Sequence, residues 1–583
     1  MKNRIISLLL VLVLAISCLF VLGACNGNGN EGEGGGEGEG TGGGTGGGGG
    51  GAGSAGYNGE WWRAIGYEQT ELRFQLTECP NAGLNPNTKR LLEGKEGFTM
   101  NRPLDKLIAT RNDNAYFNTG VSVNYAYYGT DSTKYGWGNA MNTIYQEVQN
   151  KSKTSPDMYC NFMSDMLATS LKGSFANILS ESRNSAGAGT VSNFFKVDET
   201  IDNEGYEHSG YMSDLMSSLT LSDEKFYVIA SDYFIDLIRA FFVVPVNKTL
   251  YDQKAPTMIE DLNEDGVKDM NDFFEEVKNS DWTYDRLIEY CAAVAVDENN
   301  NTNWDINDTL GFALDSDGGM MASGLMYTTT LVIIKKEWDE ENFQWNYAYP
   351  DENPDLETFA SKVALLFNSD GVAAIYNADA SGDAVAGIAG KFTRNEMLFG
   401  GIITVGNLEN AEYQAMKGEG GGFGVVPVPV YTNLDKDGNK IVDPYQTQIH
   451  TSGGAGGISH VTQKFTQCSA FIQYQSTHST EILNEYYDNN LTLDVADGMQ
   501  GNVDMLKYVR NNVRTSFDKL FEDAISFFNL KSDPNAQKNR WHNLFLGEAA
   551  YRVESMRASY ESLVGTKQDR LEVLIKEYEK LPD

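Results

Sequence analysis

The chain has 583 residues, a formal net charge of −36 and a hydrophobic content of 41%. Its length is too great for one hydrophobic core and predicts two or three lobes, and the hydrophobic content is enough to fold them. The acidic charge excludes a nucleic-acid partner, because binding a phosphate backbone needs clustered cations.

The chain begins with the pattern of an export signal. Lys2 and Arg4 precede residues 5–24, which carry no charge, and a basic region followed by an apolar region is typical of a signal peptide. The apolar run ends in Leu22-Gly23-Ala24-Cys25, which resembles the lipobox of bacterial lipoproteins. The resemblance implies cleavage before Cys25 and acylation of that residue, palmitate included. An uncleaved helix spanning the bilayer, which needs about 20 residues, is the alternative.

A glycine-rich segment follows the signal. Of the 31 residues from Asn26 to Gly56, 19 are Gly, and such a segment cannot repay the entropy of ordering. It predicts a flexible tether with a span of about 30 Å. Residues 1–24 are therefore expected to be a signal peptide and residues 25–56 a lipid-anchored tether, with the folded part on the extracellular face of the cell membrane.

Strands and helices are expected to alternate in the first half of the folded part. Residues 121–127 alternate in polarity and predict a strand, and residues 137–148 predict a helix. Residues 156–162 predict a short buried strand, with a helix from Ser164. Residues 226–238 have an extended, aromatic character. This rhythm indicates the α/β class.

The second half is expected to contain an amphipathic helix, a strand and a chain crossing before a helical C-terminal part. Leu287, Tyr290, Cys291 and Val294 mark one face of an amphipathic helix. Residues 423–431 predict a strand whose prolines end its pairing, and residues 453–457 are mostly glycine and predict a chain crossing. Beyond Thr462 most of the chain is expected to be helical. A last apolar face combines Leu571, Leu574, Ile575 and Tyr578.

Six short motifs occur in sequence along the folded part. They are Pro156-Asp157-Met158-Tyr159, Val246-Asn247-Lys248-Thr249-Leu250, Trp282-Thr283-Tyr284-Asp285-Arg286-Leu287, Asp308-Thr309-Leu310-Gly311-Phe312, Gly422 to Pro429, and Gly456-Gly457-Ile458-Ser459. Their order resembles bacterial extracellular solute-binding proteins of family 1, the carbohydrate receptors of ABC importers. The resemblance covers residues 57–583, with Leu310 where that family usually has Tyr and with a longer first segment.

The resemblance implies an α/β, two-lobed periplasmic-binding-protein-like (type 2) fold with an interlobe cleft. Lobe one would comprise residues 57–231 and 398–459, and lobe two residues 232–397 and 460–583. A monomer of this family captures its ligand by closure of a hinge, without chemistry, and delivers it to an ABC permease.

Candidate ligand-binding residues follow from the chemistry of a sugar, whose apolar faces suit aromatic rings and whose hydroxyls suit polar side chains. We expect them where strands end or the chain crosses between lobes. They are Trp137, Tyr159, Asn161, Asp165, Ser231, Asp232, Tyr233, Tyr327, His450, Thr451 and Ser452. Core packing for the aromatic residues, and helix caps or turns for the polar residues, are the alternatives.

One acidic loop has the oxygen spacing of a calcium loop, with Gly266 at its sharp turn. The candidate ligands are Asp261, Asn263, Asp265, Asp269 and Asp272. Residues 297–308 repeat the spacing without the glycine. Calcium would be structural here, and no cofactor is required for function. The alternative is an Asx-rich turn that caps the next helix.

Two other functions stay open from the sequence. One is a lipid-anchored carbohydrate-active enzyme, for which paired carboxylates would be needed across a cleft. No Gly-x-Ser-x-Gly motif is present, and the chain has only five His for a Ser/His mechanism. The other is a cell-surface adhesion protein, for which internal repeats would be typical, and we find none.

Overall fold

The computed structural model describes most of the chain between residues 69 and 581. The described residues are 69–77, 92–94, 103–150, 154–180, 210–222, 225–254, 257–315, 320–329, 331–341, 344–350, 353–375, 384–416, 422–450, 453–491, 501–514, 519, 541–546 and 553–581. The predicted signal peptide, Cys25 and the tether lie outside these residues. No described helix is both long enough and apolar enough to cross a membrane.

The first sheet has four strands in the order β12-β3-β1-β2. Its strands are β1 (Thr70–Leu76), β2 (Val121–Tyr127), β3 (Met158–Phe162) and β12 (Gly454–Ile458). β1 is parallel to β2 and β3, whereas β12 is antiparallel to β3. The helices that pack on this sheet or on one another beside it are α3 (Pro103–Thr119), α5 (Ala140–Gln149), α6 (Met163–Ser170) and α16 (Phe465–Thr477).

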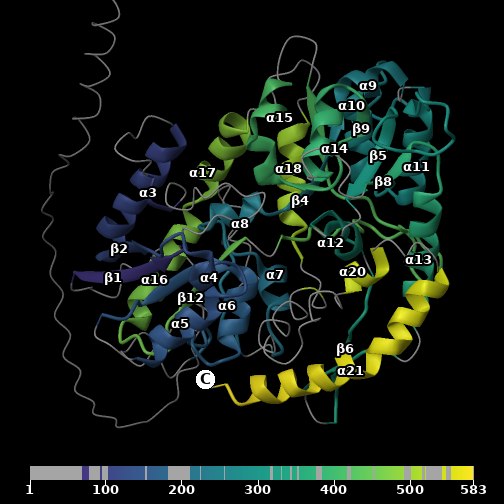
Figure 1. The fold of residues 1–583 in the computed structure, drawn as a ribbon. Coiled ribbons are helices and arrows are strands. Elements are labelled where there is room, and N and C mark those ends of the chain that lie inside the picture. The colour runs from purple at the N-terminus through teal and green to yellow at the C-terminus, as the bar shows by residue number, and fades with distance from the viewer. Residues whose placement is uncertain are drawn as a thin grey trace, which may run out of the picture. The chain divides into compact units, whose positions relative to one another are not determined.

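The second sheet has six strands in the order β10-β4-β9-β5-β8, with β11 also pairing with β4. Its strands are β4 (Phe242–Asn247), β5 (Leu310–Asp315), β8 (Val372–Ile375), β9 (Met397–Phe399), β10 (Ile403–Thr404) and β11 (Phe423–Val426). Helices around it are α9 (Lys248–Lys254), α10 (Met270–Lys278), α11 (Tyr284–Val294), α12 (Met320–Tyr327), α13 (Pro354–Phe367), α14 (Ala384–Thr393) and α18 (Asn502–Asn511). Figure 1 shows the two sheets with their own sets of helices.

The other described elements are short, apart from the last helix. They are α4 (Ser132–Tyr135), α7 (Ser213–Ser218), α8 (Ile235–Arg239), the ribbon of β6 (Lys335–Asp339) and β7 (Gln344–Ala348), the 3₁₀ helix η5 (Val405–Glu409), α15 (Ala411–Ala415), α17 (Thr480–Glu485), the π-helix η6 (Tyr486–Asn490), α20 (Trp541–Leu546) and α21 (Val553–Glu579). Two sheets with helices confirm the predicted α/β class.

The core of the second sheet shows why the Trp-Thr motif folds as it does. Trp282 is fully buried, its ring meets Phe273 edge-on at 5.0 Å, and its Nε1–H donates to the Pro427 carbonyl over 2.9 Å. Thr283 then caps α11, because its side chain accepts a hydrogen bond from the Arg286 N–H. The burial of one α11 face confirms the predicted amphipathic helix.

Three described cysteines are free and buried: Cys160, Cys291 and Cys468. Burial raises the pKa of each of these thiols well above its usual value, so they are unreactive core residues. The position predicted for Cys291 on the apolar face of a helix is confirmed.

Two segments of the chain that run antiparallel to one another join the two sheets. Phe241 and Ile449 form an isolated antiparallel bridge. The Phe242 N–H donates to the Gln448 carbonyl over 3.0 Å, and the His450 N–H donates to the Ala240 carbonyl over 2.8 Å. These two segments, residues 240–242 and 448–450, are called the crossing pair below. Residues 240–242 lead into β4, and residues 448–450 lead toward β12.

Sheet membership differs from the predicted lobe boundaries. Residues 398–459 were assigned to lobe one, but β10 and β11 within them pair with β4 of the second sheet. The chain returns to the first sheet at β12. The next helix, α16, was placed in lobe two, but it packs on α3 and β1 beside the first sheet. The motifs marked the strands correctly, but pairing between strands far apart in sequence leaves no local signal.

The segment predicted to be extended, residues 226–238, is also partly helical. Its last residues form α8, which contacts both β12 and η5. A short helix at this point turns the chain from the first sheet into β4, and Tyr227, Tyr233 and Phe234 before it are buried in the core rather than aligned in a strand.

Candidate functional site

Trp137 lies in the turn before α5, and a buried carboxylate holds this turn. Asp165 on α6 accepts hydrogen bonds from the N–H groups of Gly138 (2.8 Å) and Met141 (3.0 Å). The Nε1–H of Trp137 donates to Ser164 Oγ over 3.0 Å. Burial raises the pKa of Asp165 to about 7, although both N–H groups act to lower it. Asp165 therefore positions the turn, and the Trp137 ring keeps part of its surface exposed.

Tyr159 and Asn161 lie inside the first sheet on β3 and are fully buried. Asn161 Oδ1 accepts from the Phe162 N–H over 2.8 Å, while its Nδ2 has no partner among the described residues. Burial, reinforced by the Glu147 carboxylate, raises the pKa of Tyr159. In this conformation both residues are core residues of the sheet, which for Tyr159 is the alternative that we left open.

Ser231 and Tyr233 are buried where the chain leaves the first sheet. Ser231 Oγ accepts a hydrogen bond from Ser476 Oγ on α16 over 2.8 Å. The Tyr233 hydroxyl is 3.0 Å from the Tyr125 hydroxyl, and the Arg111 guanidinium lies 4.9 Å from the centre of its ring. These contacts fasten the start of the crossing to α3, α16 and β2.

Asp232 forms a buried, two-pronged ion pair with Arg510 of α18. Arg510 Nε donates to Oδ1 over 3.1 Å, and Nη2 donates to Oδ2 over 2.7 Å. The Arg510 side chain is only 10% exposed and the Asp232 side chain only 6% exposed. Burial alone lowers the pKa of Arg510, but the Asp232 carboxylate more than offsets this and raises it. Because α18 packs on β11, the pair connects the first sheet with the second.

The remaining predicted residues divide between described and undescribed positions. Tyr327 at the end of α12 is buried, with 3% of its surface exposed. The half-buried His450 belongs to the crossing pair, and its ring lies edge-on to Phe242 at 6.0 Å. Thr451 and Ser452 lie outside the described residues.

The predicted residues thus form separate groups. Ser231, Asp232, Tyr233 and His450 lie at or next to the crossing, Trp137 and Asp165 lie at the start of α5, and Tyr159 and Asn161 lie on β3.

A second buried charge network at the crossing was missed from the sequence. Arg239 on α8 is fully buried, and it donates to Glu409 through Nε over 2.9 Å and to Asp236 through Nη1 over 2.9 Å. The Tyr486 hydroxyl donates to Glu409 Oε1 over 2.7 Å. Four groups from α8, η5 and η6 meet here, so no spacing along the chain could have revealed them.

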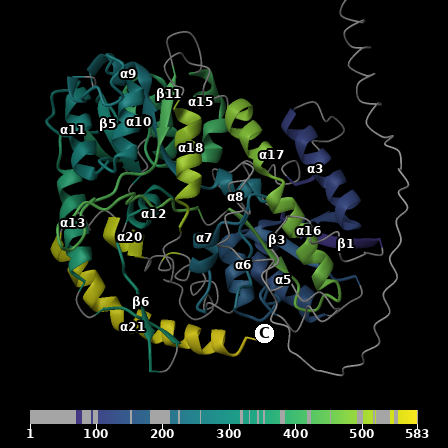
Figure 2. The ribbon, with the colours of Figure 1, turned by 180° about the vertical axis from the view of Figure 1, so that it is seen from behind.

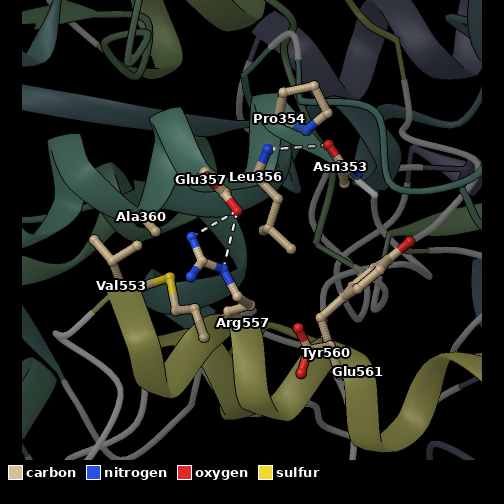
Figure 3. Close-up of a pocket in the computed structure, with 10 residues that line it drawn as sticks. Asn353, Pro354, Leu356, Glu357, Ala360, Val553, Arg557, Tyr560 and Glu561 are labelled. Carbon is tan, nitrogen blue, oxygen red and sulfur yellow. Dashed lines mark hydrogen bonds and ion pairs between the residues drawn. The ribbon is translucent and has the colours of Figure 1, made fainter. Parts of the chain in front are cut away.

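A cavity of about 390 Å³ lies between α13 and α21, as Figure 3 shows. Its apolar lining includes Leu356 and Met556, and an ion pair between Glu357 and Arg557 borders it, with 2.8 Å between the closest atoms. A volume of this size is within the range of small-molecule sites, about 300–1,000 Å³. None of the predicted ligand-binding residues lines it.

Most of the polar side chains around this cavity have partners within the protein. Asn353 caps α13 through a hydrogen bond from the Leu356 N–H (3.0 Å), and the Tyr560 hydroxyl donates to the Pro350 carbonyl over 2.6 Å. The Tyr560 contact and the Glu357–Arg557 ion pair hold α21 against α13 and the residues before it. The cavity is therefore better explained by incomplete packing between two helices than as the carbohydrate site.

The first acidic loop is fixed by its own hydrogen bonds. Asp272 accepts from the N–H groups of Leu262 (2.7 Å) and Asp269 (2.9 Å), and Asp261 accepts from the Gly266 N–H over 2.9 Å. Asp269 and Asp272 form a capping box at the start of α10. This is the helix-capping turn that we set against a calcium loop.

The second acidic loop repeats this arrangement. Asp297 accepts from the Thr302 N–H over 2.9 Å, and Asp308 accepts from the Asp305 N–H over 2.9 Å. Among the described residues, no group of three or more His, Cys, Asp and Glu side chains is arranged to hold a metal ion. Calcium binding at either loop stays a prediction.

Comparisons with known proteins are informative only at the level of structure. No protein-family description matches the sequence, and no curated protein is similar to it. The structure is similar to those of solute-binding proteins of ABC transporters.

Two of these structures illustrate the degree of similarity. The galacto-N-biose/lacto-N-biose I-binding protein of an ABC transporter from Bifidobacterium longum is 11% identical, with 86% of this chain and 97% of that chain covered and a TM-score of 0.46. The extracellular solute-binding protein from Staphylococcus aureus in complex with maltose is 12% identical, with 85% and 98% covered and a TM-score of 0.43. At TM-scores below 0.5 these similarities establish neither a ligand nor a function for this chain.

Proposed function

We propose that this chain is the extracellular, lipid-anchored receptor of an ABC importer, and that it captures a carbohydrate, an oligosaccharide in particular, by hinge closure. The observation that carries the proposal is the crossing pair, in which residues 240–242 and 448–450 run antiparallel between two sheets. Two bodies joined by short paired segments can rotate toward one another while both cores stay intact. A ligand held by both bodies then favours the closed state.

The six sequence motifs give independent support, because each begins or ends an element that builds this arrangement. Asn247 ends β4 directly after the crossing, and its Oδ1 accepts from the Leu250 N–H (3.0 Å) at the start of α9. Gly456 lies on β12 where a Cβ atom would come within 2.4 Å of the Phe234 ring. The motifs therefore coincide with the turns and close approaches that the crossing needs.

Trp137 is the side chain that we propose for stacking on a sugar ring. It is partly exposed, its turn is held by Asp165, and its indole is oriented by Ser164. An aromatic face of this kind suits the C–H face of a pyranose. Asp165 would then act on affinity through the position of Trp137, without touching the ligand.

The lipid anchor is proposed from the lipobox alone. Incorporation of labelled palmitate into the full chain, and its loss in Cys25→Ala with equal expression, tests this part. Two or more acyl chains are needed for stable anchoring, at about 0.8 kcal/mol for each buried CH₂ group. Labelling that is unchanged in Cys25→Ala would contradict acylation at this position.

A thermal-shift screen against a carbohydrate library tests the ligand class, because a compound that binds only the native state raises its melting temperature. Titration calorimetry with the best compound then compares Trp137→Ala with Trp338→Ala. Trp338 lies on the β6–β7 ribbon with 46% of its surface exposed and serves as the matched control.

We expect at least about tenfold weaker binding for Trp137→Ala, equivalent to about 1.4 kcal/mol, and unchanged binding for the control. Equal affinities for both variants would remove Trp137 from the site. A library without any stabilising compound would contradict the carbohydrate receptor, and release of shortened sugars would support the enzyme instead.

A further inference from the structure

The last described helix, α21, touches both sheet bodies. It has 27 residues, which at 1.5 Å per residue corresponds to about 40 Å. Figures 1 and 2 show it running from beside α13 of the second sheet to a C-terminal end near α5 and α6 of the first sheet. The chain is thus connected across the two bodies at a place other than the crossing pair.

The N-terminal half of α21 is fastened to the second body. Met556 and Tyr560 are buried, and the Tyr560 ring stacks on Trp541 of α20 at 5.4 Å. Arg557 pairs with Glu357 of α13. Farther along the helix, Gln568 Oε1 accepts from the Tyr349 N–H over 2.9 Å. These contacts form the second-body anchor.

The C-terminal end of α21 is fastened to the first body. The Tyr578 hydroxyl hydrogen-bonds with the Lys225 carbonyl and with Thr220 Oγ1. The Lys225 Nζ donates in return to the Leu581 carbonyl over 2.8 Å, and the Tyr227 ring meets Tyr578 edge-on at 5.8 Å. These contacts form the first-body anchor.

Residues 225–227 belong to the first body by their backbone hydrogen bonding. The Ile178 N–H donates to the Phe226 carbonyl over 2.8 Å. Two residues beyond, Ile229 bridges to Gly456 of β12, which is a strand of the first sheet. The first-body anchor is therefore attached to the sheet itself.

We infer that α21 is a strap that restrains rotation of the two bodies about the crossing pair. A helix cannot lengthen without breaking its hydrogen bonds, so any rotation that changes the distance between the anchors must bend the helix or release one anchor. Among the described contacts the first-body anchor is the smaller one, because on the α21 side it is made by Tyr578 and by the Leu581 carbonyl that follows the helix. When the two bodies rotate, this is the anchor whose contacts break first.

The strap also has an internal weak point. Gly565 lies near the middle of α21, and a Cβ atom there would meet nothing within 4 Å, so packing does not require a glycine. Glycine is the poorest helix former apart from proline. Gly565 lies between Tyr560 and Gln568 of the second-body anchor, so a bend there would separate the main part of this anchor from the rest of the helix.

This inference rests on the proposed hinge, but its test needs no ligand. Tyr578→Phe in the full chain removes the hydroxyl of the first-body anchor and keeps the ring. Tyr560→Phe makes the same chemical change on the same helix, where the hydroxyl donates to Pro350 over 2.6 Å within the second body. Hydrogen exchange measured by mass spectrometry then follows peptides that contain the crossing pair, which neither substitution touches.

We expect exchange at residues 240–242 and 448–450 to become about tenfold faster in Tyr578→Phe and to stay unchanged in Tyr560→Phe. Lys225→Met removes the other half of the same anchor from the first-body side and is expected to act in the same direction. Unchanged exchange at the crossing pair in both anchor variants, or an equal increase in Tyr560→Phe, would overturn the strap. Either result leaves the thermal-shift test of ligand binding unaffected.

Discussion

Breaking the ion pair between Asp232 and Arg510 is expected to destabilise the protein far more than breaking a comparable surface pair. Arg510→Met removes both hydrogen bonds to the carboxylate and leaves Asp232, only 6% exposed, without its counter-charge. Removing one partner of such a buried pair costs about 3–5 kcal/mol. At about 2 °C per kcal/mol for a large domain, this corresponds to a fall in melting temperature of at least about 6 °C.

Arg514→Met provides the matched control. Arg514 follows the end of α18, and its Nε is 3.2 Å from Asp214 Oδ2, but the two side chains are 44% and 59% exposed. An exposed pair of this kind contributes at most about 1 kcal/mol. Differential scanning calorimetry should therefore show a large shift for Arg510→Met and a small one for Arg514→Met. Equal shifts for the two variants would refute the argument that burial gives the Asp232 pair its importance.

Three further predictions follow from the described residues. Burial raises the pKa of Asp165 to about 7, above the ordinary value of about 3.9, so the folded state favours the protonated carboxyl group and this contribution to stability is lost as the pH rises from about 4 to about 7. The melting temperature should therefore fall over that range in the wild type and fall much less in Asp165→Asn. Parallel pH profiles for the two proteins would contradict this role of Asp165. Gly311→Ala places a Cβ atom 2.2 Å from Cys291 Cα and should lower the melting temperature strongly. Gly565→Ala meets no atom within 4 Å and should raise the free energy of unfolding by about 0.5–1 kcal/mol. A change of the same sign in the stability of both variants would refute the packing argument. Calcium predicted at the loop of Asp261 to Asp272 should raise the melting temperature above that in chelator; because the loop is also fixed by its own hydrogen bonds, melting curves that coincide would assign it as a helix-capping turn instead.

Local patterns in the sequence predicted much of the fold. The apolar spacing from Leu287 to Val294 identified α11, because a buried helix face is a property of neighbouring residues. The strand β3 was recognised from the short buried run of residues 156–162. Such signals lie within a few residues of one another.

Features that depend on distant parts of the chain could not be predicted. β11 pairs with β4 across about 180 residues of sequence, and nothing in residues 423–426 identifies that partner. Tyr159 and Tyr233 were expected at a ligand site because they are aromatic and follow strands, but packing against other elements buries both. Arg510, which completes the environment of Asp232, lies 278 residues away from it.

Small-angle X-ray scattering of the ligand-free and ligand-saturated protein tests the central claim most directly. Using the best compound from the carbohydrate screen, the account predicts a smaller radius of gyration in the bound state, because the two bodies rotate together about the crossing pair. Scattering curves that superimpose with and without a saturating ligand would contradict capture by closure.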